Sequence, residues 1–273
     1  MARPERRSIM LKIENVCKTF NAGTVNEKKA LKGLNLHLKP GEFVTVIGGN
    51  GAGKSTMLNA TAGVFGVDSG KIIIDGVDVT HLPEYKRAKY IGRVFQDPMM
   101  GTAANMWIEE NLALAARRGK PRTLRAGITK AEREEYREAL KILDLGLEER
   151  LTSKVGLLSG GQRQALTLLM ASLVKPKLLL LDEHTAALDP KTAAKVLDAT
   201  EKIVSRDNLT TLMITRNMKD AISHGNRLIM MYNGKIVIDV SGEEKKKLTV
   251  PQLLELFSKV SGSDEASDKL LLS

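Results

Sequence analysis

The sequence predicts an α/β fold, because short apolar runs that suit buried parallel strands alternate with patterns that suit helices. Three such runs occur, at Phe43–Ile47, at 178–181 and at Thr211–Ile214. The first run leads directly into a glycine-rich turn. A helix pattern that starts after Asp189, with Pro190 at its first position, joins the other two.

Alternating apolar and polar residues predict antiparallel strands on either side of this core. Leu11 and Ile13 belong to one such strand, and residues 34–38 belong to a second, which ends at a Pro-Gly turn. The dipeptide Asn233-Gly234 predicts a type I′ turn within a β-hairpin. Further strands are expected at 71–74, 91–94, 227–232 and 235–240.

Helical patterns account for most of the remaining chain. Residues 54–62 predict a helix that Gly63 ends, since glycine readily adopts the left-handed conformation found after helices. Helical periodicity dominates from about residue 99 to 175 and is clearest at 131–145. Thr249 caps a last helix that begins at Pro251, and its leucines and Phe257 are expected to dock on the body.

These patterns predict one main domain, residues 10–242, followed by two C-terminal segments. The α/β core comprises residues 10–98 and 176–242, and residues 99–175 form an inserted α-helical subdomain. Residues 243–260 form a helical extension. Residues 261–273 are polar, so a disordered tail is expected there.

The formal net charge of +10 suits contact with phosphates. No finger, homeodomain, RNA-binding signature or aromatic-interleaved basic patch accompanies this charge, so no nucleic-acid partner is expected. The lysines at 245–247 adjoin two glutamates and are interpreted as a solvated face. No apolar stretch approaches the roughly 18 residues that span a bilayer, and the first ten residues lack a secretory signal pattern. A cytoplasmic protein is therefore expected.

A phosphate-binding motif, G-x-x-x-x-G-K-S, follows the first apolar run. Its glycines allow successive backbone N–H groups to point at anionic oxygens, and the dipole of the following helix reinforces them. Lys54 is expected to bridge the β- and γ-phosphates, and the Ser55 hydroxyl is expected to bind Mg²⁺. The nucleotide-binding residues predicted here are Gly48, Gly49, Asn50, Gly51, Ala52, Gly53, Lys54, Ser55 and Thr56.

Two acidic residues, Asp182 and Glu183, follow the four leucines at 178–181. Ligands of open α/β sheets collect at the carboxyl ends of the strands. Asp182 is therefore a candidate ligand of Mg²⁺, and Glu183 is a candidate general base that activates water. The alternative is two ordinary surface acids at a strand end.

A second glycine motif, Leu158-Ser159-Gly160-Gly161-Gln162, precedes a helix and offers another N-terminal anion site. The three motifs, in this order, resemble those of the ATP-binding cassette (ABC) ATPases, and the resemblance extends from about Leu11 to Gly242. It implies a P-loop NTPase (RecA-like) core with an antiparallel β subdomain, and ATP and Mg²⁺ as cofactors. It also implies a homodimer in which Ser159, Gly160, Gly161 and Gln162 of one subunit cover the γ-phosphate held by the other.

The same resemblance assigns roles to single residues. Gln96 matches the glutamine that senses Mg²⁺ and the attacking water, and so joins Ser55 and Asp182 as a metal-site residue. Phe20 resembles the aromatic residue that stacks on adenine, and the alternative is an ordinary core phenylalanine. Asp189 matches a residue at the dimer interface, and it also suits a helix N-cap.

The chain departs from the family pattern at Arg216, where the family normally has a histidine that contacts the γ-phosphate and the catalytic water. A guanidinium can donate hydrogen bonds but accepts none, and it can pair with Glu183. Arg216 is therefore expected either to slow hydrolysis or to act as an arginine finger. Neither His184 nor His224 is an evident substitute for the histidine.

The resemblance implies an ATP-binding and ATP-hydrolysing subunit of a transporter, bound at the cytoplasmic face of the membrane to separate integral permease subunits. Residues 96–112, with Trp107, Glu109 and Glu110, resemble the surface that receives a permease. The C-terminal pattern is similar to that of a poorly characterised prokaryotic import family, so import with an extracytoplasmic substrate-binding protein is expected. The alternatives are a soluble ABC ATPase of a non-transport assembly and a nucleotide-switched subunit with impaired hydrolysis.

Overall fold

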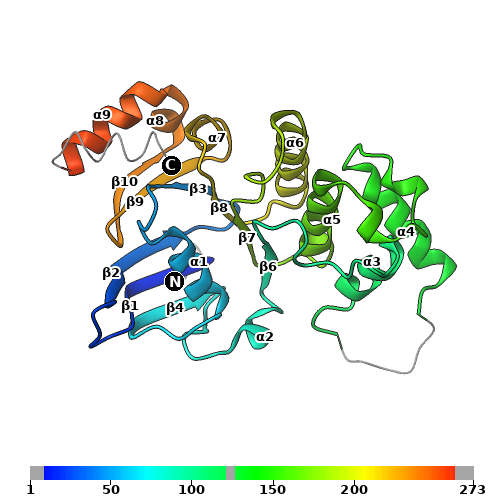
Figure 1. Cartoon of the computed structure of the whole chain (residues 1–273), viewed down its shortest axis with the longest axis horizontal. Helices are drawn as coiled ribbons and strands as arrows, with labels where there is room; N and C mark the ends of the chain where they lie inside the picture. The colour runs from blue at the N-terminus through cyan, green and yellow to red at the C-terminus, as the bar shows by residue number, and fades with distance from the viewer. Residues whose placement is uncertain (1–8, 121–126, 262–273) are drawn as a thin grey trace, which may run out of the picture. The chain divides into compact units, whose positions relative to one another are not determined.

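The computed structural model describes residues 9–120 and 127–261, so the expected tail lies almost entirely outside the described residues. The chain forms two compact units (Figure 1). Unit 1 contains the residues up to Tyr90 and those from Thr210 onwards, and unit 2 contains Ile91–Leu209. Unit 2 thus includes strands and a long helix in addition to the helices between residues 99 and 175.

The first sheet of unit 1 is antiparallel, as the alternating pattern predicted. Its strands are β1 (Leu11–Phe20), β2 (Lys28–Leu38), β4 (Ser69–Ile74) and β5 (Val77–Asp78), in the order β2-β1-β4-β5. Leu11 pairs with Leu38 on one side and with Ile74 on the other, and all three side chains are fully buried. The alternation therefore directs one face of the sheet into the core of unit 1.

The second set of strands in unit 1 surrounds β3 (Phe43–Ile47), whose residues are all buried. β8 (Thr211–Ile214) and β9 (Arg227–Tyr232) are parallel to β3, and β10 (Lys235–Ser241) is antiparallel to β9. Asn233 and Gly234 have φ angles of 49° and 78°, which confirms the predicted turn. The helix α1 (Lys54–Ala62) follows β3 and ends at Gly63, as predicted.

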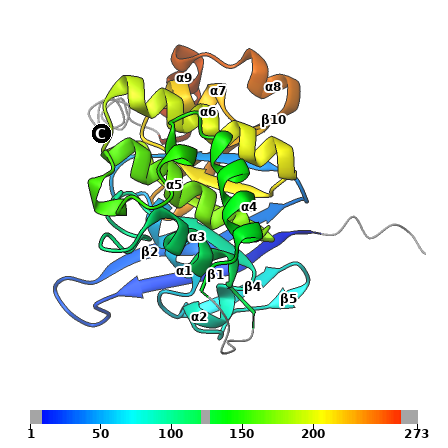
Figure 2. The ribbon, with the colours of Figure 1, turned by 90° about the vertical axis from the view of Figure 1, so that its right-hand side faces the viewer.

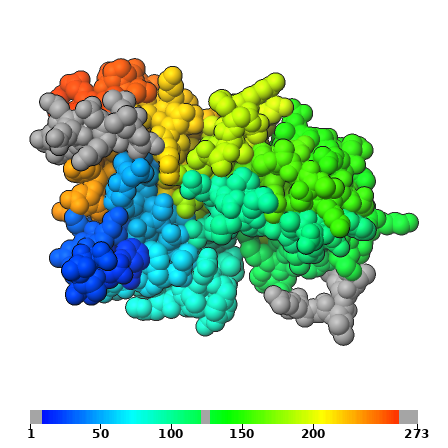
Figure 3. All heavy atoms as spheres, in the orientation of Figure 1, coloured from blue at the N-terminus to red at the C-terminus, as the bar shows by residue number. Residues whose placement is uncertain are grey.

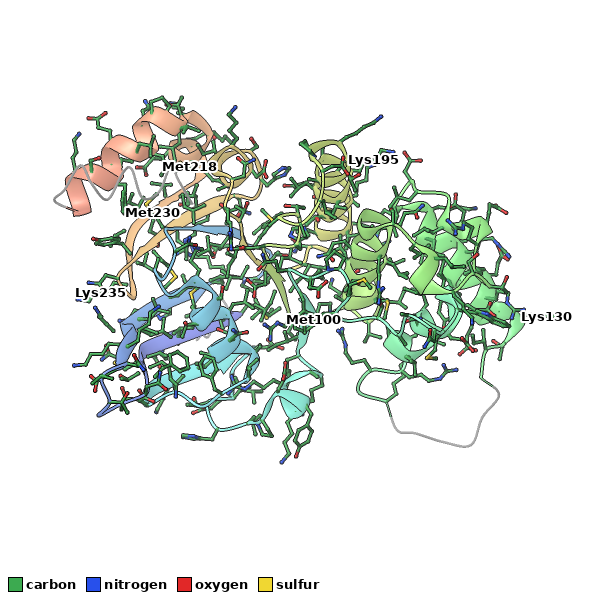
Figure 4. All side chains as sticks on the ribbon, in the orientation of Figure 1. Met100, Lys130, Lys195, Met218, Met230 and Lys235 are labelled. Atoms are coloured by element: carbon green, nitrogen blue, oxygen red, sulfur yellow. The ribbon has the colours of Figure 1, made fainter. Side chains whose placement is uncertain are left out.

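The C-terminal helices of unit 1 cover the strands β9 and β10. These helices are α7 (Met218–Ser223), α8 (Gly242–Lys247) and α9 (Val250–Ser261), and their side chains form the surface at this end of unit 1 (Figure 3). Leu253 and Phe257 of α9 are fully buried in a cluster that includes Met230, with Met218 packed against it (Figure 4). The predicted docking of the last helix is therefore confirmed.

Of the residues 245–247, which were interpreted as a solvated face, Lys246 and Lys247 are exposed as expected, but Lys245 of α8 is not. Its side chain is buried, and the ammonium donates to the backbone carbonyl oxygens of His224 and Gly225. The interpretation rested only on the two glutamates that precede the lysines in the sequence. The acceptors come from a turn some 20 residues away, which local charge patterning cannot indicate.

Unit 2 combines a parallel strand pair with a group of α-helices. β6 (Ile91–Val94) pairs with β7 (Leu178–Asp182), and Figure 2 shows the helices of this unit facing the viewer. These helices are α3 (Ile108–Ala116), α4 (Lys130–Lys141), α5 (Gly160–Leu173) and α6 (Pro190–Asp207), with the short turns η1 (Leu147–Glu149) and η2 (Val155–Leu157). Among the described residues, no helix combines the length and the apolarity that crossing a bilayer requires.

The helix α4 is shorter than the predicted span of 131–145. It ends at Lys141, and the chain then adopts left-handed conformations at Asp144 (φ 51°) and Gly146 (φ 67°). Leu143 is nevertheless buried. The apolar residues thus keep their helical spacing beyond the end of the helix, and for this reason the predicted span was four residues too long at its C-terminal end.

A buried arginine holds the C-terminal end of α1. Arg87, at the end of α2 (Glu84–Arg87), is only 2% exposed, and its guanidinium donates to the carbonyl oxygens of Ala60 (2.8 Å) and Thr61 (2.9 Å). It also donates to the carbonyl oxygens of Leu82 and Thr80. Burial lowers the pKa of the Arg87 guanidinium. Arg87 thus satisfies last-turn carbonyl groups that a helix leaves without partners.

We expect Arg87→Met to lower the free energy of unfolding by about 2–4 kcal/mol, because it leaves several buried carbonyl groups without a donor. Equilibrium denaturation in urea measures the loss. Lys86→Met, at an exposed position of the same helix, is the matched control. Equal stability of the two variants would contradict the assigned role of Arg87.

Candidate functional site

The phosphate-binding loop of unit 1 needs glycine at two positions because neighbouring backbone leaves no room for a Cβ atom. A Cβ on Gly48 would lie 2.2 Å from the Met231 carbonyl oxygen, and one on Gly53 would lie 2.7 Å from that of Ala30. Both residues also have positive φ angles, of 148° and 105°. The β9–β10 hairpin thus supports the loop from one side, and Gly234 adds a backbone hydrogen bond to the loop at Ala52 (3.0 Å).

The N-terminus of α1 is suited to bind an anion. Its N-cap is Gly53, which offers no side-chain cap, and its first turn contains no acidic residue. The backbone N–H groups of this turn and the positive end of the helix dipole are therefore left for a ligand. Ser55 is exposed in this turn and Thr56 is half-buried.

Lys54 is held by the loop itself. Its side chain is 6% exposed, and the ammonium donates to the carbonyl oxygens of Gly48 (2.6 Å) and Gly49 (3.2 Å). A phosphate group would give this ammonium anionic acceptors, which form stronger hydrogen bonds than neutral carbonyl groups. The family often has a bulkier residue at the position of Gly49. A Cβ atom on Gly49 would meet no other atom within 4 Å, so this difference does not distort the loop.

One residue near the loop was missed by the sequence analysis. Lys28 lies directly across from Phe20 in the β1–β2 pair, and its ammonium is 3.4 Å from the position of a Cβ on Gly51. It therefore places a second cation beside the loop. Only the pairing of β1 with β2 reveals this position, because no short motif includes Lys28.

Phe20 is half-buried at the end of β1. Its ring packs edge-on against Phe65, with ring centroids 5.2 Å apart and an interplanar angle of 84°. Part of the ring thus remains exposed, as stacking on a base requires, and adenine stacking by Phe20 stays a prediction.

The acidic residues lie at the end of β7 in unit 2. Asp182 is the last residue of this strand and follows four fully buried leucines. Its Oδ2 atom lies 3.9 Å from a guanidinium nitrogen of Arg93, so a cation already faces this carboxylate. Its hard oxygen atoms suit Mg²⁺, which proteins usually hold through one or two carboxylates together with substrate phosphates.

Glu183 is buried and has a positive φ angle of 45°. The left-handed conformation is costly for a residue with a side chain, and such strain concentrates at functional sites. Among the described residues, no group of three or more histidine, cysteine, aspartate or glutamate side chains could hold a metal ion alone.

Gln96 is exposed two residues beyond the end of β6. The residue before it, Phe95, accepts a hydrogen bond at its carbonyl oxygen from the side chain of Gln164 (2.8 Å), which is fully buried in α5. Within unit 2, the base of the Gln96 segment is thus tied to the helix that begins at the second glycine motif.

The second glycine motif forms the start of α5. Ser159 is the N-cap, its Oγ atom accepts from the Gln162 N–H (3.3 Å), and the Gln162 side chain accepts from the Ser159 N–H (3.2 Å). Ser159 and Gly160 are exposed. A Cβ on Gly161 would lie 1.9 Å from a methyl carbon of Thr192, so the packing of α6 against this turn requires glycine there.

Asp189 caps α6, as the N-cap interpretation predicted. Its carboxylate accepts from the Thr192 N–H (3.1 Å), and hydrogen bonds with Thr192 lower its pKa. His184 is buried, and its Nε2 atom lies 3.1 Å from the hydroxyl oxygen of Thr200, which belongs to α6. These contacts give His184 a structural role inside unit 2.

Arg216 is exposed in unit 1, between β8 and Asn217, the N-cap of α7. His224 lies at the other end of α7 and accepts at its carbonyl oxygen from Lys245. The histidine missing at position 216 is therefore not replaced by His224 within this helix, because the two positions occupy opposite ends of α7.

The exposed side chains of the segment 96–112 include Trp107 but neither Glu109 nor Glu110. Trp107 is 42% exposed, but Glu109 is 1% exposed and bound in a bidentate ion pair with Arg133 (2.5 and 2.9 Å). The expectation that Glu109 forms part of a docking surface is therefore wrong. Glu110 is half-buried and accepts from the Trp107 N–H (2.6 Å).

The structure thus distributes the predicted site residues over both units. Unit 1 holds Phe20, the phosphate-binding loop and Arg216, and unit 2 holds Gln96, the two acids and the second glycine motif. Each group lies in a local arrangement that suits its predicted chemistry.

Comparisons with known proteins agree with this arrangement. Residues 31–186 match the family model described as "ABC transporter". The "Tyrosine transport ATP-binding protein" of Clostridioides difficile (strain R20291) is 46% identical over 248 residues, which are 91% of this chain and 98% of that protein. The "Spermidine/putrescine import ATP-binding protein PotA" of Haemophilus influenzae (strain 86-028NP) is 33% identical and matches 89% of this chain but 60% of its own length.

A solved structure shows the same likeness. A dimeric ATP-binding cassette in a post-hydrolysis state, bound to ADP and phosphate, superposes with a TM-score of 0.72 at 30% identity, over 85% of this chain and 98% of its own. The two curated relatives are named as ATP-binding proteins of transport and import, so a non-transport assembly is not favoured. The chain belongs to the ATP-binding subunits of ABC transporters.

Proposed function

We propose that the chain binds and hydrolyses Mg-ATP as one half of a homodimer that energises an importer. The observation that carries this proposal is that the described residues contain two glycine-rich helix starts, at α1 and α5, but one pair of candidate catalytic acids, Asp182 and Glu183. A head-to-tail dimer gives each bound nucleotide one turn of each kind. The dimeric cassette among the structural relatives supports this arrangement.

In the proposed reaction, the backbone of residues 48–56 and the Lys54 ammonium bind the phosphates of ATP. Phe20 stacks on the base. Ser55, Gln96 and Asp182 would hold Mg²⁺, which neutralises developing charge on the phosphate oxygens. Glu183 accepts a proton from the attacking water, and its positive φ angle is of the kind that concentrates at functional sites. Ser159, Gly160, Gly161 and Gln162 of the second subunit cover the γ-phosphate.

We also propose the division expected from the sequence, with a core of residues 10–98 and 176–242 and a helical subdomain at 99–175. Hydrolysis in such an arrangement couples the nucleotide to the helical subdomain through Gln96. The hydrogen bond from Gln164 to Phe95 supports this coupling.

For the partner, we propose an integral permease at the cytoplasmic face of the membrane. The docking surface is an apolar patch that we define as Trp107 and Leu157, which are 42% and 71% exposed. Backbone hydrogen bonds from Val155 to Met106 and from Gly156 to Ala104 hold their two segments together. Exposed apolar groups of this kind mark protein interfaces.

For the substrate, we propose an amino acid, with tyrosine as the first candidate. The support is the name of the Clostridioides difficile relative, which matches this chain over almost its whole length. Substrate contacts belong to the permease and to an extracytoplasmic binding protein, so this chain would supply energy without selecting the substrate.

We expect Trp107→Ala combined with Leu157→Ser to reduce recovery of the permease at least fivefold in gentle-detergent copurification, because the exposed apolar contacts are lost. The affinity for ATP should stay within about twofold. Tyr85→Ser, which removes a 75% exposed ring from unit 1, is the control. Failure of the unaltered chain to retain any membrane protein would contradict the transporter proposal, and full recovery with the double variant would exclude the patch.

A separate prediction concerns Arg216 and the rate of ATP hydrolysis. A permanently charged group that accepts no hydrogen bond cannot exchange protons with the attacking water as an imidazole can. We therefore expect Arg216→His to raise steady-state hydrolysis about 10- to 1,000-fold with little change in ATP affinity. Lys219→His, at an exposed position of α7, is the matched control. A lower rate in Arg216→His would instead identify Arg216 as an arginine finger.

A further inference from the structure

Phe20 lies in a small group of side chains within unit 1, which we call the Phe20 cluster and define as Lys18, Phe20, Phe65 and Asp68. The rings of Phe20 and Phe65 meet edge to face, with centroids 5.2 Å apart at 84°. Aromatic pairs favour this geometry because the positive ring edge meets the negative ring face. Phe65 therefore restricts the orientation of the Phe20 ring.

Lys18 joins the two rings. Its ammonium lies 5.5 Å from the centroid of Phe20 and 5.5 Å from that of Phe65, within the range of a cation–π interaction. Its side chain is 16% exposed, so water screens the interaction only in part. The same ammonium pairs with Asp68 at 3.2 Å, which holds the cation in place.

Asp68 binds the segment after α1 to the end of β1. Its carboxylate accepts from the Thr19 N–H at 2.5 Å, and its own N–H donates to the Cys17 carbonyl oxygen at 2.9 Å. Burial raises the pKa of Asp68, but the hydrogen bond from Thr19 and the ion pair with Lys18 outweigh it, so the pKa lies below its usual value. The carboxylate is thus charged at neutral pH, as both contacts require.

The pairing of β1 with β2 is irregular at this point. The register of β1 against β2 shifts between Lys18 and Thr19, directly before Phe20. Such irregularities redirect side chains and occur often beside functional sites. Because the Asp68 carboxylate accepts the Thr19 N–H at this shift, it stabilises the backbone conformation that presents Phe20.

The cluster is also connected to the phosphate-binding loop. Phe65 follows α1 by three residues, and α1 begins at that loop and is about 14 Å long. Gly63 ends the helix in a left-handed conformation and turns the chain toward β1. One rigid helix therefore carries phosphate-binding residues at its start and the support for Phe20 just beyond its end.

We propose that Phe65, Lys18 and Asp68 are positioning residues that hold the Phe20 ring ready to stack on the nucleotide base. They set the affinity for the base without affecting the affinity for the phosphates. This inference rests on the proposed function, in which Phe20 stacks on adenine. Ordering a side chain before binding removes a cost that would otherwise weaken the complex.

The test compares Mg-ATP with magnesium tripolyphosphate, which lacks the adenosine, and measures both dissociation constants by calorimetry. We expect Phe65→Leu to weaken ATP binding about three- to tenfold, the range for loss of an aromatic pair. Tripolyphosphate binding should stay within about twofold. In a double-mutant cycle, Phe65→Leu should have no further effect on ATP when Phe20→Leu is already present.

Two further variants keep the test decisive. Tyr85→Leu removes an exposed ring from the same unit and should leave both affinities unchanged. Lys18→Met keeps the apolar stem but removes the charge, and it should weaken ATP binding selectively even if Phe65→Leu does not fold. Thermal unfolding followed by circular dichroism establishes that each variant is folded.

The results that would overturn this inference differ from the result that would overturn the proposed function. Equal weakening of both ligands by Phe65→Leu, full additivity with Phe20→Leu, or no effect of Phe20→Leu on ATP would overturn the inference. If the unaltered chain bound neither ligand, the proposed function itself would fail.

Discussion

The structure depends on how the two helices that follow the glycine motifs satisfy the backbone groups at their ends. Every helix leaves several N–H groups at its start and several carbonyl groups at its end without partners. α1 starts at Gly53 without a side-chain cap, whereas Gln162 and Ser159 cap the start of α5 reciprocally. At the far ends, the buried Arg87 and the half-buried Arg118 donate from their guanidinium groups to carbonyl groups at the ends of α1 and α5.

This difference between the two helix starts has a consequence for the order of events. The first turn of α1 has no side-chain cap, so its N–H groups suit the initial capture of ATP. The turn at Ser159 is already capped, and its remaining hydroxyl hydrogen and exposed Gly160 suit a weaker, second contact. A site built from both turns would therefore bind nucleotide first and close around it afterwards. Arg216 would then decide how fast the closed site turns over.

Sequence patterns predicted the parts of the structure that depend on local chemistry. The helix that Gly63 ends, the turn at Asn233-Gly234 and the docking of the last helix follow from nearby residues, and the structure confirms them. Contacts between segments that lie far apart in the chain have no short sequence pattern, so they were not predicted. The burial of Glu109 depends on Arg133, and the positions of Lys28 and Phe65 beside the candidate site depend on strand pairing and on the turn after α1.

The most direct test of the shared site is complementation between two inactive subunits. Lys54→Met removes the phosphate-binding ammonium, and Ser159→Phe blocks the second glycine motif, so each variant alone should lose hydrolysis at least a hundredfold. In a head-to-tail dimer, each site combines the phosphate-binding loop of one subunit with the second glycine motif of the other. A dimer with one subunit of each variant therefore has both substitutions in the same site, and its other site is intact. Mixing the two variants in equal amounts should therefore restore about a quarter of the normal rate if the subunits exchange at random and the sites act independently. A mixture as inactive as either variant alone, with subunit exchange demonstrated, would contradict the account.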